Sequence, residues 1–277
     1  MSRVQEAFND GEGIVLMTGV PGTGKTLLCH LLMERLDQGH EISFLTHTHM
    51  RDRTGLLQAV LHDLSLPYQG KAEQELRLTL IDHLLGRYRE GKKPLLLIDE
   101  AHHLSADLLE ELRLLGNLEG QGGKAVQILL VGQADLLHTL AHPGLMALRQ
   151  RIQVRTQIDP LPLEEAADYL LSHLRRSGAK AEKIFGMETL EILGSHSGGI
   201  PRLMNQAAMQ SLRLAWENKL GEVEVEIALE ALNQMGLSGP TGLENSIAGE
   251  ENVLHLDSEA HQMDPTYRLY MAPGRTA

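Results

Sequence analysis

The chain has 277 residues, of which 42% are hydrophobic and 3% aromatic, and its formal net charge is −12. This length is sufficient for one large domain or two, and the composition predicts a core of aliphatic rather than aromatic side chains. The acidic balance argues against a protein coated with nucleic acid, because neutralising phosphates requires a surplus of Lys and Arg, but it leaves room for a local basic patch.

The sequence shows no sign of export or membrane insertion. Residues 1–10 contain no apolar core after a basic flank, so we expect no signal peptide. No apolar run approaches the roughly 20 residues that span a bilayer. The single cysteine, Cys29, excludes an internal disulfide framework and suits a reducing compartment. These features predict a soluble, cytoplasmic protein without a transmembrane segment.

Short apolar runs alternate with helical patterns from residue 13 to about residue 157. The runs cover residues 14–17, 42–45, 95–98 and 128–131, with a weaker one at 152–154. Continuous runs of this kind are typical of strands buried on both faces of a parallel sheet. Strand and helix in alternation predict stacked strand–helix–strand units, which is an α/β fold.

The pattern changes after Asp159. Pro162 suits the start of a helix, and further helical stretches cover residues 187–193, 201–216 and 225–235. No strand signal of comparable strength accompanies them, so residues 159–237 are predicted to form a small, all-helical domain. Residues 238–277 are polar, acidic and poor in core residues, and we expect this tail to be disordered.

The segment after the first apolar run matches the phosphate-binding pattern GxxxxGK[ST] and precedes an apolar helix face, as this motif requires. Its residues are Gly19, Val20, Pro21, Gly22, Thr23, Gly24, Lys25 and Thr26. Gly22 and Gly24 permit backbone conformations that turn successive N–H groups towards an anion, and the following helix adds its positive end. Lys25 is expected to reach the β- and γ-phosphates of ATP, and the Thr26 hydroxyl to ligate Mg²⁺.

A second apolar strand ends in two acids, Asp99 and Glu100. The carboxyl ends of parallel strands face the ligand crevice, so these carboxylates are predicted to point at the nucleotide. Asp99 would hold the Mg²⁺ shell, and Glu100 would orient and deprotonate the attacking water. The alternative is that Asp99 caps a turn and Glu100 is solvated, but the phosphate loop upstream favours the catalytic interpretation.

Three other residues near these motifs have simpler interpretations. His102 and His103 follow the acids directly, but neighbouring side chains diverge and no further Cys or His lies at ligand spacing. We therefore expect two polar loop histidines rather than a zinc site. Cys29 lies within the helix after the phosphate loop, where a small buried side chain is expected rather than a redox centre.

With both motifs in place, the sequence resembles the AAA+ ATPases of the ExeA/GspA general-secretion type, which are related to origin-recognition-like and transposition ATPases. The resemblance covers roughly residues 11–236, and the segments that carry it are residues 97–104, 111–119, 128–133, 148–152 and 198–202. It implies a P-loop NTPase of the AAA+ type, with a parallel sheet flanked by helices in residues 1–158 and a helical lid domain in residues 159–237.

The resemblance also implies roles for residues outside the two motifs. Gln133 matches the sensor-1 position, which contacts the γ-phosphate or the attacking water. Arg151 matches the finger that enters a neighbouring subunit's site, with Arg149 as the second candidate. Arg202 matches sensor 2. The alternative for each arginine is a solvated surface cation.

The sequence departs from this family in three places. Only about a dozen residues precede the first strand, where family members carry another helix and an adenine-contacting segment. The peptidoglycan-binding or transmembrane portion of the secretion proteins has no counterpart. The acidic tail after Leu237 matches no pattern of the family.

Three functions are compatible with this sequence. The first is an oligomeric ATPase that hydrolyses ATP to drive or time the assembly of a secretion or surface-export machine with a protein partner. The second is an ATP-dependent DNA-binding regulator of the transposition type. Basic residues that could serve it are Arg51 and Arg53 after the second strand, and Arg175, Arg176, Lys180 and Lys183 in the lid. The third is an ATP-binding switch without hydrolysis, against which Glu100 argues.

Overall fold

The structure is a computed structural model that describes residues 2–36, 39–46, 49–237 and 239. It divides into two compact units. The first comprises Met1–Pro160 together with Ile200–Arg202, and the second comprises Leu161–Gly199 and the chain from Leu203 onwards. The acidic tail predicted at residues 238–277 lies outside the described residues, apart from Gly239.

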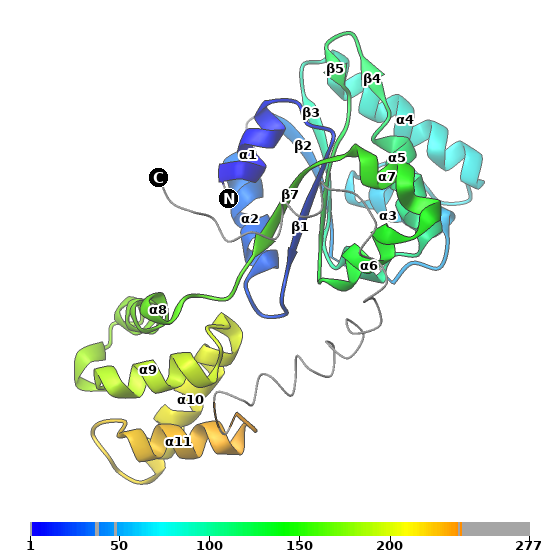
Figure 1. Cartoon of the computed structure of the whole chain (residues 1–277). Coiled ribbons are helices and arrows are strands. Elements are labelled where there is room, and N and C mark those ends of the chain that lie inside the picture. The colour runs from blue at the N-terminus through cyan, green and yellow to red at the C-terminus, as the bar shows by residue number, and fades with distance from the viewer. Residues whose placement is uncertain (1, 37–38, 47–48, 238, 240–277) are drawn as a thin grey trace, which may run out of the picture. The chain divides into compact units, whose positions relative to one another are not determined.

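The first unit is built on a five-stranded sheet in the order β2-β3-β6-β1-β7, in which every pairing is parallel (Figure 1). The strands are β1 (Ile14–Gly19), β2 (His40–Leu45), β3 (Lys93–Ile98), β6 (Gln127–Gly132) and β7 (Ile152–Ile158). The fold class predicted from the alternating apolar runs is therefore confirmed. The central strands β1 and β6 are buried throughout because helices cover both faces of the sheet.

Side chains of the central strands alternate between two cores. In β1, Ile14 and Leu16 pack into the core beneath α3–α7, whereas Val15 and Met17 pack against α1 and α2. The helices of this unit are α1 (Ser2–Asn9), α2 (Lys25–Leu36), α3 (Arg53–Asp63), α4 (Glu73–Arg89), α5 (Ala106–Leu115), α6 (Asp135–Ala141) and α7 (Met146–Arg151). Two 3-10 turns, η1 (Ala101–His103) and η2 (Pro143–Leu145), complete it.

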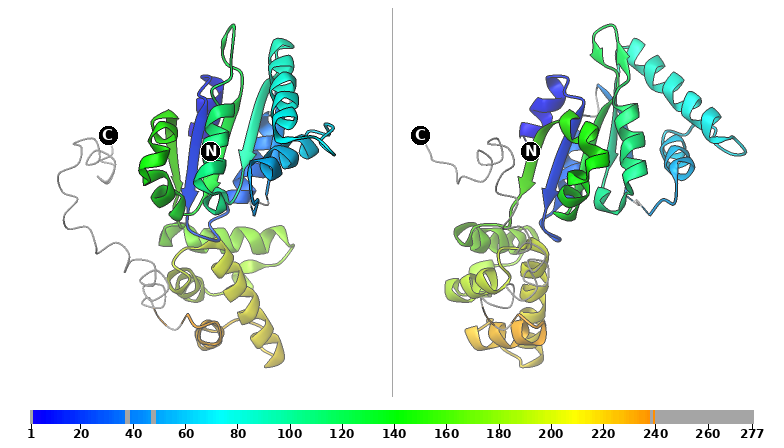
Figure 2. Two further views of the ribbon diagram at one scale, coloured as in Figure 1. Left: turned by 90° about the vertical axis from the view of Figure 1, so that its right-hand side faces the viewer. Right: turned by 45° about the vertical axis from the view of Figure 1, so that its right-hand side comes forward.

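Two elements of this unit were not expected from the sequence. Helix α1 occupies the short segment before β1, and its Phe8 is fully buried. The buried side chain of Gln127 fixes this segment, since its Nε2 donates to the carbonyl oxygens of Phe8 (2.9 Å) and Glu12 (3.2 Å). A two-stranded hairpin, β4 (Glu119–Gly120) with β5 (Gly123–Lys124), projects beyond the end of the sheet opposite the β1–α2 loop (Figure 2).

The second unit is helical. Its elements are α8 (Leu163–Arg176), η3 (Ala181–Lys183), α9 (Met187–His196), α10 (Pro201–Glu217), whose first two residues are grouped with the first unit, and α11 (Val225–Gln234). Its core contains Leu170, Leu193, Met204 and Leu232. Among the described residues of this unit, strand pairing is limited to one isolated parallel bridge between Phe185 and Val223. Across the described chain, no helix combines the length and apolar character that crossing a membrane requires.

Candidate nucleotide site

Three neighbouring strands place the predicted site residues at one edge of the sheet. Strand β6 lies between β1 and β3, and all three run in the same direction. The phosphate loop follows β1, Gln133 follows β6, and Asp99 and Glu100 follow β3. Because carboxyl ends of adjacent parallel strands meet at one edge, these segments converge although they are far apart in sequence.

The phosphate loop has the backbone of an anion-binding nest. Gly22 and Gly24 have φ values of +86° and +94°, a region that L side chains rarely adopt. The turn is closed by Thr23, whose Oγ1 donates to the carbonyl oxygen of Val20 at 2.9 Å. Helix α2 begins at Lys25, so its unpaired N–H groups and positive end face the loop.

Lys25 is buried beside the loop, with 6% of its surface exposed. Its Nζ donates to the carbonyl oxygens of Gly19 (2.8 Å) and Val20 (3.0 Å). Burial lowers the pKa of this amine, while the nearby Glu100 and Asp99 carboxylates partly oppose that shift. A buried cation beside a loop of backbone N–H groups favours a polyanion such as a triphosphate.

Asp99 and Thr26 together present oxygen ligands to the loop. Asp99 is 2% exposed, and its Oδ2 accepts a hydrogen bond from Thr26 Oγ1 at 2.5 Å. Its Oδ1 accepts from the backbone N–H of Glu100 at 2.9 Å. A carboxylate and a hydroxyl beside a phosphate cradle are the oxygen-only donors that Mg²⁺ prefers, so the residues present fit this ion.

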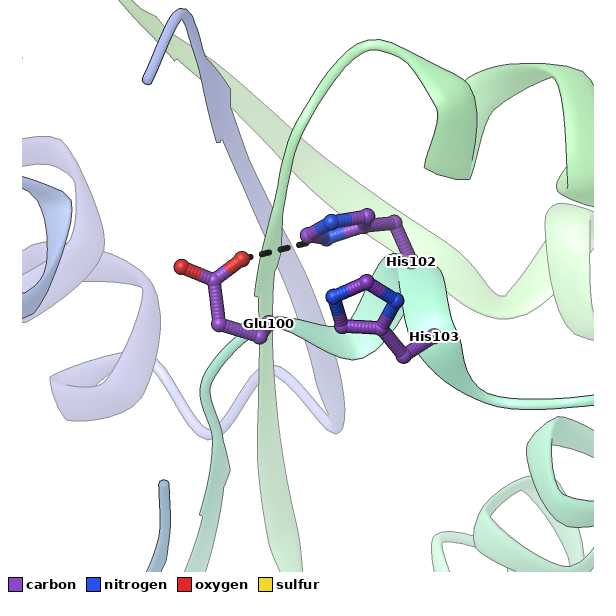
Figure 3. A group of neighbouring side chains, drawn as sticks. All are labelled: Glu100, His102 and His103. Atoms are coloured by element: carbon purple, nitrogen blue, oxygen red, sulfur yellow. Dashed lines mark ion pairs between the residues drawn. The ribbon is translucent and has the colours of Figure 1, made fainter. Parts of the chain in front are cut away.

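Glu100 turns the chain sharply after β3 and faces a histidine. Its φ of +52° is in the left-handed region, which is uncommon for a residue with a side chain. Its Oε2 lies 3.3 Å from Nδ1 of His102, and the two groups point towards each other in Figure 3. The ring centroids of His102 and His103 are only 4.0 Å apart. The expectation that these adjacent side chains diverge is therefore wrong, because η1 winds them onto one side.

Comparison with known proteins identifies the domain that carries these motifs. Residues 8–140 match a family model described as an AAA domain. The chain carries an AAA domain. This AAA domain spans the phosphate loop, the Asp99–Glu100 pair and Gln133, which are the residues that the sheet brings together.

Curated relatives extend the likeness beyond the AAA domain. The chain is 35% identical over 255 residues to the General secretion pathway protein A of Aeromonas hydrophila, covering 90% of this chain and 46% of that protein. It is 24% identical over 257 residues to the Holliday junction branch migration complex subunit RuvB of Myxococcus xanthus, covering 87% of this chain and 64% of that one. The chain thus spans about half to two thirds of the length of these relatives.

A solved structure confirms the fold of the AAA domain. The ORC2 protein of Aeropyrum pernix, in ADPNP and ADP complexes, superposes with a TM-score of 0.63 at 15% identity. The match covers 84% of this chain and 65% of that chain. The resemblance to AAA+ proteins of the secretion and origin-recognition types, predicted from motifs, is therefore confirmed.

The residues expected to act beside the two central motifs lie at opposite ends of the sheet. Gln133 directly follows β6, between the two central motifs, and is half-buried. Arg149 and Arg151 are exposed at the end of α7, just before β7. Ile152 at the start of β7 pairs with Ile14, whereas Ile158 pairs with Gly19 at the phosphate loop. Arg151 therefore lies at the amino end of the sheet. Since a strand rises about 3.3 Å per residue, Arg151 is about 20 Å from the phosphate loop of its own chain.

Arg202 and the buried Cys29 complete the set of predicted residues. The backbone N–H of Arg202, in the segment grouped with the first unit, donates to the carbonyl oxygen of Gly22 at 3.3 Å, and its side chain is exposed. Cys29 is fully buried, and desolvation raises the pKa of its thiol to about 12. A protonated, buried thiol agrees with the structural role expected for this residue.

The basic residues considered for DNA binding are partly paired with acids. Arg53 begins α3 and lies 3.8 Å from a carboxylate oxygen of Asp107. In the second unit, the guanidinium of Arg175 forms an ion pair with Glu182, which lies between Lys180 and Lys183 in sequence. These pairings reduce the positive charge available to a phosphate backbone.

Proposed function

We propose that this protein binds ATP with Mg²⁺ and hydrolyses it as an oligomer. The observation that supports this proposal is the convergence of the phosphate loop, the Thr26–Asp99 hydrogen bond and Glu100 at one edge of the sheet. The A. pernix ORC2 protein, solved in ADPNP and ADP complexes, carries nucleotide on the same fold.

Each residue of the site has a defined task in this proposal. The loop amides of residues 19–26 and Lys25 hold the phosphates, and Thr26 and Asp99 hold Mg²⁺, which offsets negative charge on the β- and γ-phosphates. Glu100 accepts the proton of the attacking water. Gln133 positions that water or contacts the γ-phosphate from the end of β6.

The test of hydrolysis uses two single variants. Lys25→Ala is expected to lose nucleotide binding and turnover together, because the cation over the phosphates is removed. Glu100→Gln keeps the shape of the side chain but not its basicity, so we expect retained binding with phosphate release reduced by at least about 100-fold, as for loss of a general base. Retained turnover in Glu100→Gln would contradict this assignment. A wild-type chain that binds ATP without phosphate release would favour the non-hydrolysing switch.

Arg151 supports an oligomeric arrangement because it lies too far from its own phosphate loop to contact a bound nucleotide. We propose that it completes the site of a neighbouring subunit, where a guanidinium stabilises charge that develops in the transition state. Arg149 is the second candidate. The proposal extends to residues 159–237 as the lid domain, with Arg202 contacting the nucleotide.

A mixing experiment tests the trans role of Arg151. Arg151→Ala alone and Lys25→Ala alone are each expected to be inactive. In a mixture, an intact phosphate loop of one chain can face the intact Arg151 of the other, so part of the turnover should return. Arg149→Ala in place of Arg151→Ala tests the second candidate, and it should keep its turnover without mixing if Arg151 is the residue that acts. If the mixture stays inactive while nucleotide raises the molecular mass, Arg151 does not act between subunits.

The likeness to the A. hydrophila General secretion pathway protein A supports a cytoplasmic ATPase that drives or times assembly of a secretion or surface-export machine. Capture with the Glu100→Gln variant loaded with ATP should retain envelope proteins, because the ATP-bound state persists longest. The M. xanthus relative, named for Holliday junction branch migration, supports DNA binding as the second candidate. An ATP-dependent, salt-sensitive shift of duplex DNA would favour that candidate.

A further inference from the structure

Beside the phosphate site, Glu100, His102 and His103 form a compact cluster of metal-ligating side chains. Each offers one ligand atom, and these atoms all lie within 4.8 Å of one another. Figure 3 shows the Glu100 carboxylate and the two imidazoles gathered on one side of η1. The cluster arises because Glu100 adopts a left-handed backbone conformation and the following residues wind into a 3-10 turn.

The spacing within the cluster suits a small tetrahedral ion. Zinc binds nitrogen and carboxylate oxygen at about 2.0–2.1 Å, which places neighbouring ligand atoms about 3.3 Å apart in a tetrahedron. The Glu100 Oε2 to His102 Nδ1 distance is 3.3 Å. The third ligand atom requires only a rotation of the exposed His103 side chain to approach the same point.

His102 supplies a second observation that indicates a ligand. Its side chain is 6% exposed, and its Nδ1 is buried without a hydrogen-bond partner among the described residues while facing the carboxylate. Imidazole nitrogen and carboxylate oxygen are both zinc ligands, so a single ion between these two atoms would bind both.

The surroundings constrain His102 more than the exposed His103. A Cβ on Gly132 would lie 3.2 Å from the backbone nitrogen of His102, so glycine at the end of β6 is what lets η1 approach the sheet. The His103 ring also stacks on His49, with centroids 4.6 Å apart. Packing therefore restricts the His102 ring, which reduces the entropy lost when a ligand binds, whereas the exposed His103 ring can turn towards the ligand.

We propose that Glu100, His102 and His103 bind a divalent transition metal of the zinc class, and that this ion withdraws Glu100 from water activation. The site differs from the adjacent Thr26–Asp99 pair in its donors: imidazole nitrogen selects zinc-like ions, whereas all-oxygen ligands suit Mg²⁺. A carboxylate coordinated to zinc is a weaker base, because the positive charge of the ion stabilises the ionised form, so it accepts a water proton less readily. Metal binding stands on geometry alone, while the inhibitory effect rests on the proposed hydrolysis.

Metal binding is tested first, on the full, untagged chain without nucleotide. Co²⁺ is the probe, because a tetrahedral Co²⁺ site gives a characteristic visible absorption, and Zn²⁺ should displace it. We expect one such site per chain. His103→Ala should weaken Co²⁺ binding by at least about tenfold, the lower limit seen even when a supporting partner of a metal ligand is lost. His138→Ala, an exposed histidine on α6, is the matched control and should bind as the wild type does.

Equal Co²⁺ affinity in the wild type and His103→Ala, or no tetrahedral spectrum, would overturn the proposed site.

Inhibition is tested second, by phosphate release from Mg²⁺-ATP with free Zn²⁺ held constant by a chelating buffer. The wild type should lose most of its turnover as the site fills, with nucleotide affinity changed less than about twofold, since the phosphate ligands stay in place. For His103→Ala, the zinc concentration that halves its own turnover should rise by the same factor as its metal dissociation constant.

The two proposals fail in different ways. A wild-type chain that binds Co²⁺ in this site but shows no turnover in metal-free buffer contradicts the proposed hydrolysis and leaves the metal site standing. Turnover that continues with the site filled by Zn²⁺ overturns the inhibitory role.

Discussion

The glycines of the phosphate loop are required for backbone conformation, and Gly24 separates this requirement from crowding. Its φ is +94°, yet a Cβ there would meet no atom within 4 Å. An alanine at this position would therefore be strained by its backbone alone. The strain would oppose the same orientation of N–H groups that the anion nest needs.

Gly24→Ala is expected to lower the free energy of unfolding by about 1–3 kcal/mol, the cost of one residue in a sparsely populated conformation, and to weaken nucleotide binding. Urea unfolding and a nucleotide titration measure the two effects. Gly86→Ala within α4 is the matched control, because a Cβ there is also free of contacts and the backbone is helical. It should raise stability by about 0.4–1 kcal/mol. Similar stabilities for both variants would contradict the role assigned to backbone conformation.

Cys29 offers a probe of the same region. Its thiol is fully buried and its pKa is raised to about 12, so the thiolate is scarce at ordinary pH. We expect no reaction with a disulfide reagent near pH 8 in the native protein, and rapid reaction of the urea-unfolded chain, whose thiol titrates near 8.5. Rapid labelling of native protein would show that α2 opens readily from the sheet.

Residues within linear motifs could be predicted from the sequence, whereas their mutual contacts could not. The order of Gly19 to Thr26 and the position of Asp99 after an apolar strand already indicate a phosphate and metal site. The contact between Glu100 and His102 depends on a left-handed residue and a 3-10 turn, which no residue pattern specifies. The only available signal was the run of an acid and two histidines within four residues.

Helices α4 and α5 are joined by an ion pair between Arg77 and the buried Glu111. Glu111 is fully buried, and its two carboxylate oxygens accept hydrogen bonds from Nε and a terminal nitrogen of Arg77, each at 2.8 Å. Arg77 also contacts Glu73 on its own helix at 3.0 Å. The hydrogen bond to Glu111 is the main cause that raises the pKa of this guanidinium.

Arg77→Leu should therefore destabilise the protein by about 3–5 kcal/mol, because it leaves a buried carboxylate without its partner. Adding Glu111→Leu to the same chain should restore much of the loss. Arg213→Leu is the control: its pair with Glu217 on α10 is largely exposed, and its removal should change stability by no more than about 0.5 kcal/mol. A small effect of Arg77→Leu in chemical denaturation would contradict the importance of the buried pair.

The strands were predictable because burial on both faces leaves a continuous apolar run, as in residues 95–98. Elements that were missed have weaker local signals. Strands β4 and β5 have two residues each, a Gly and a charged residue, so neither periodicity nor composition indicates a strand there. Helix α1 is short, and the apolar spacing of Val4, Ala7 and Phe8 was its one signal.

At the scale of the whole molecule, nucleotide binding links local geometry to global stability. A ligand that binds only the folded chain stabilises it by about 2.7 kcal/mol at 100 times its dissociation constant. The phosphate loop joins β1 to α2, so this stabilisation acts on the centre of the sheet.

Saturating Mg²⁺-ATP should raise the Tm of the wild type by several degrees, as expected for a stabilisation of this size. In Lys25→Ala the shift should disappear, because the buried cation over the loop is absent. Mg²⁺ alone is the ligand control and should have little effect. Thermal unfolding followed by fluorescence or calorimetry measures the shift. An equal shift in Lys25→Ala would place the nucleotide elsewhere on the chain.

Strand β6 lies between β1 and β3, the strands that carry the two halves of the site, although both of them precede it in the sequence. Because β1 and β3 each pair with β6 and not with each other, the phosphate loop and Asp99 cannot be aligned until residues 127–132 are in the sheet. On the ribosome, a growing chain will have exposed both motifs well before that strand emerges. We therefore expect nascent chains to bind triphosphate late and in a single step, after residues 127–132 have joined the sheet.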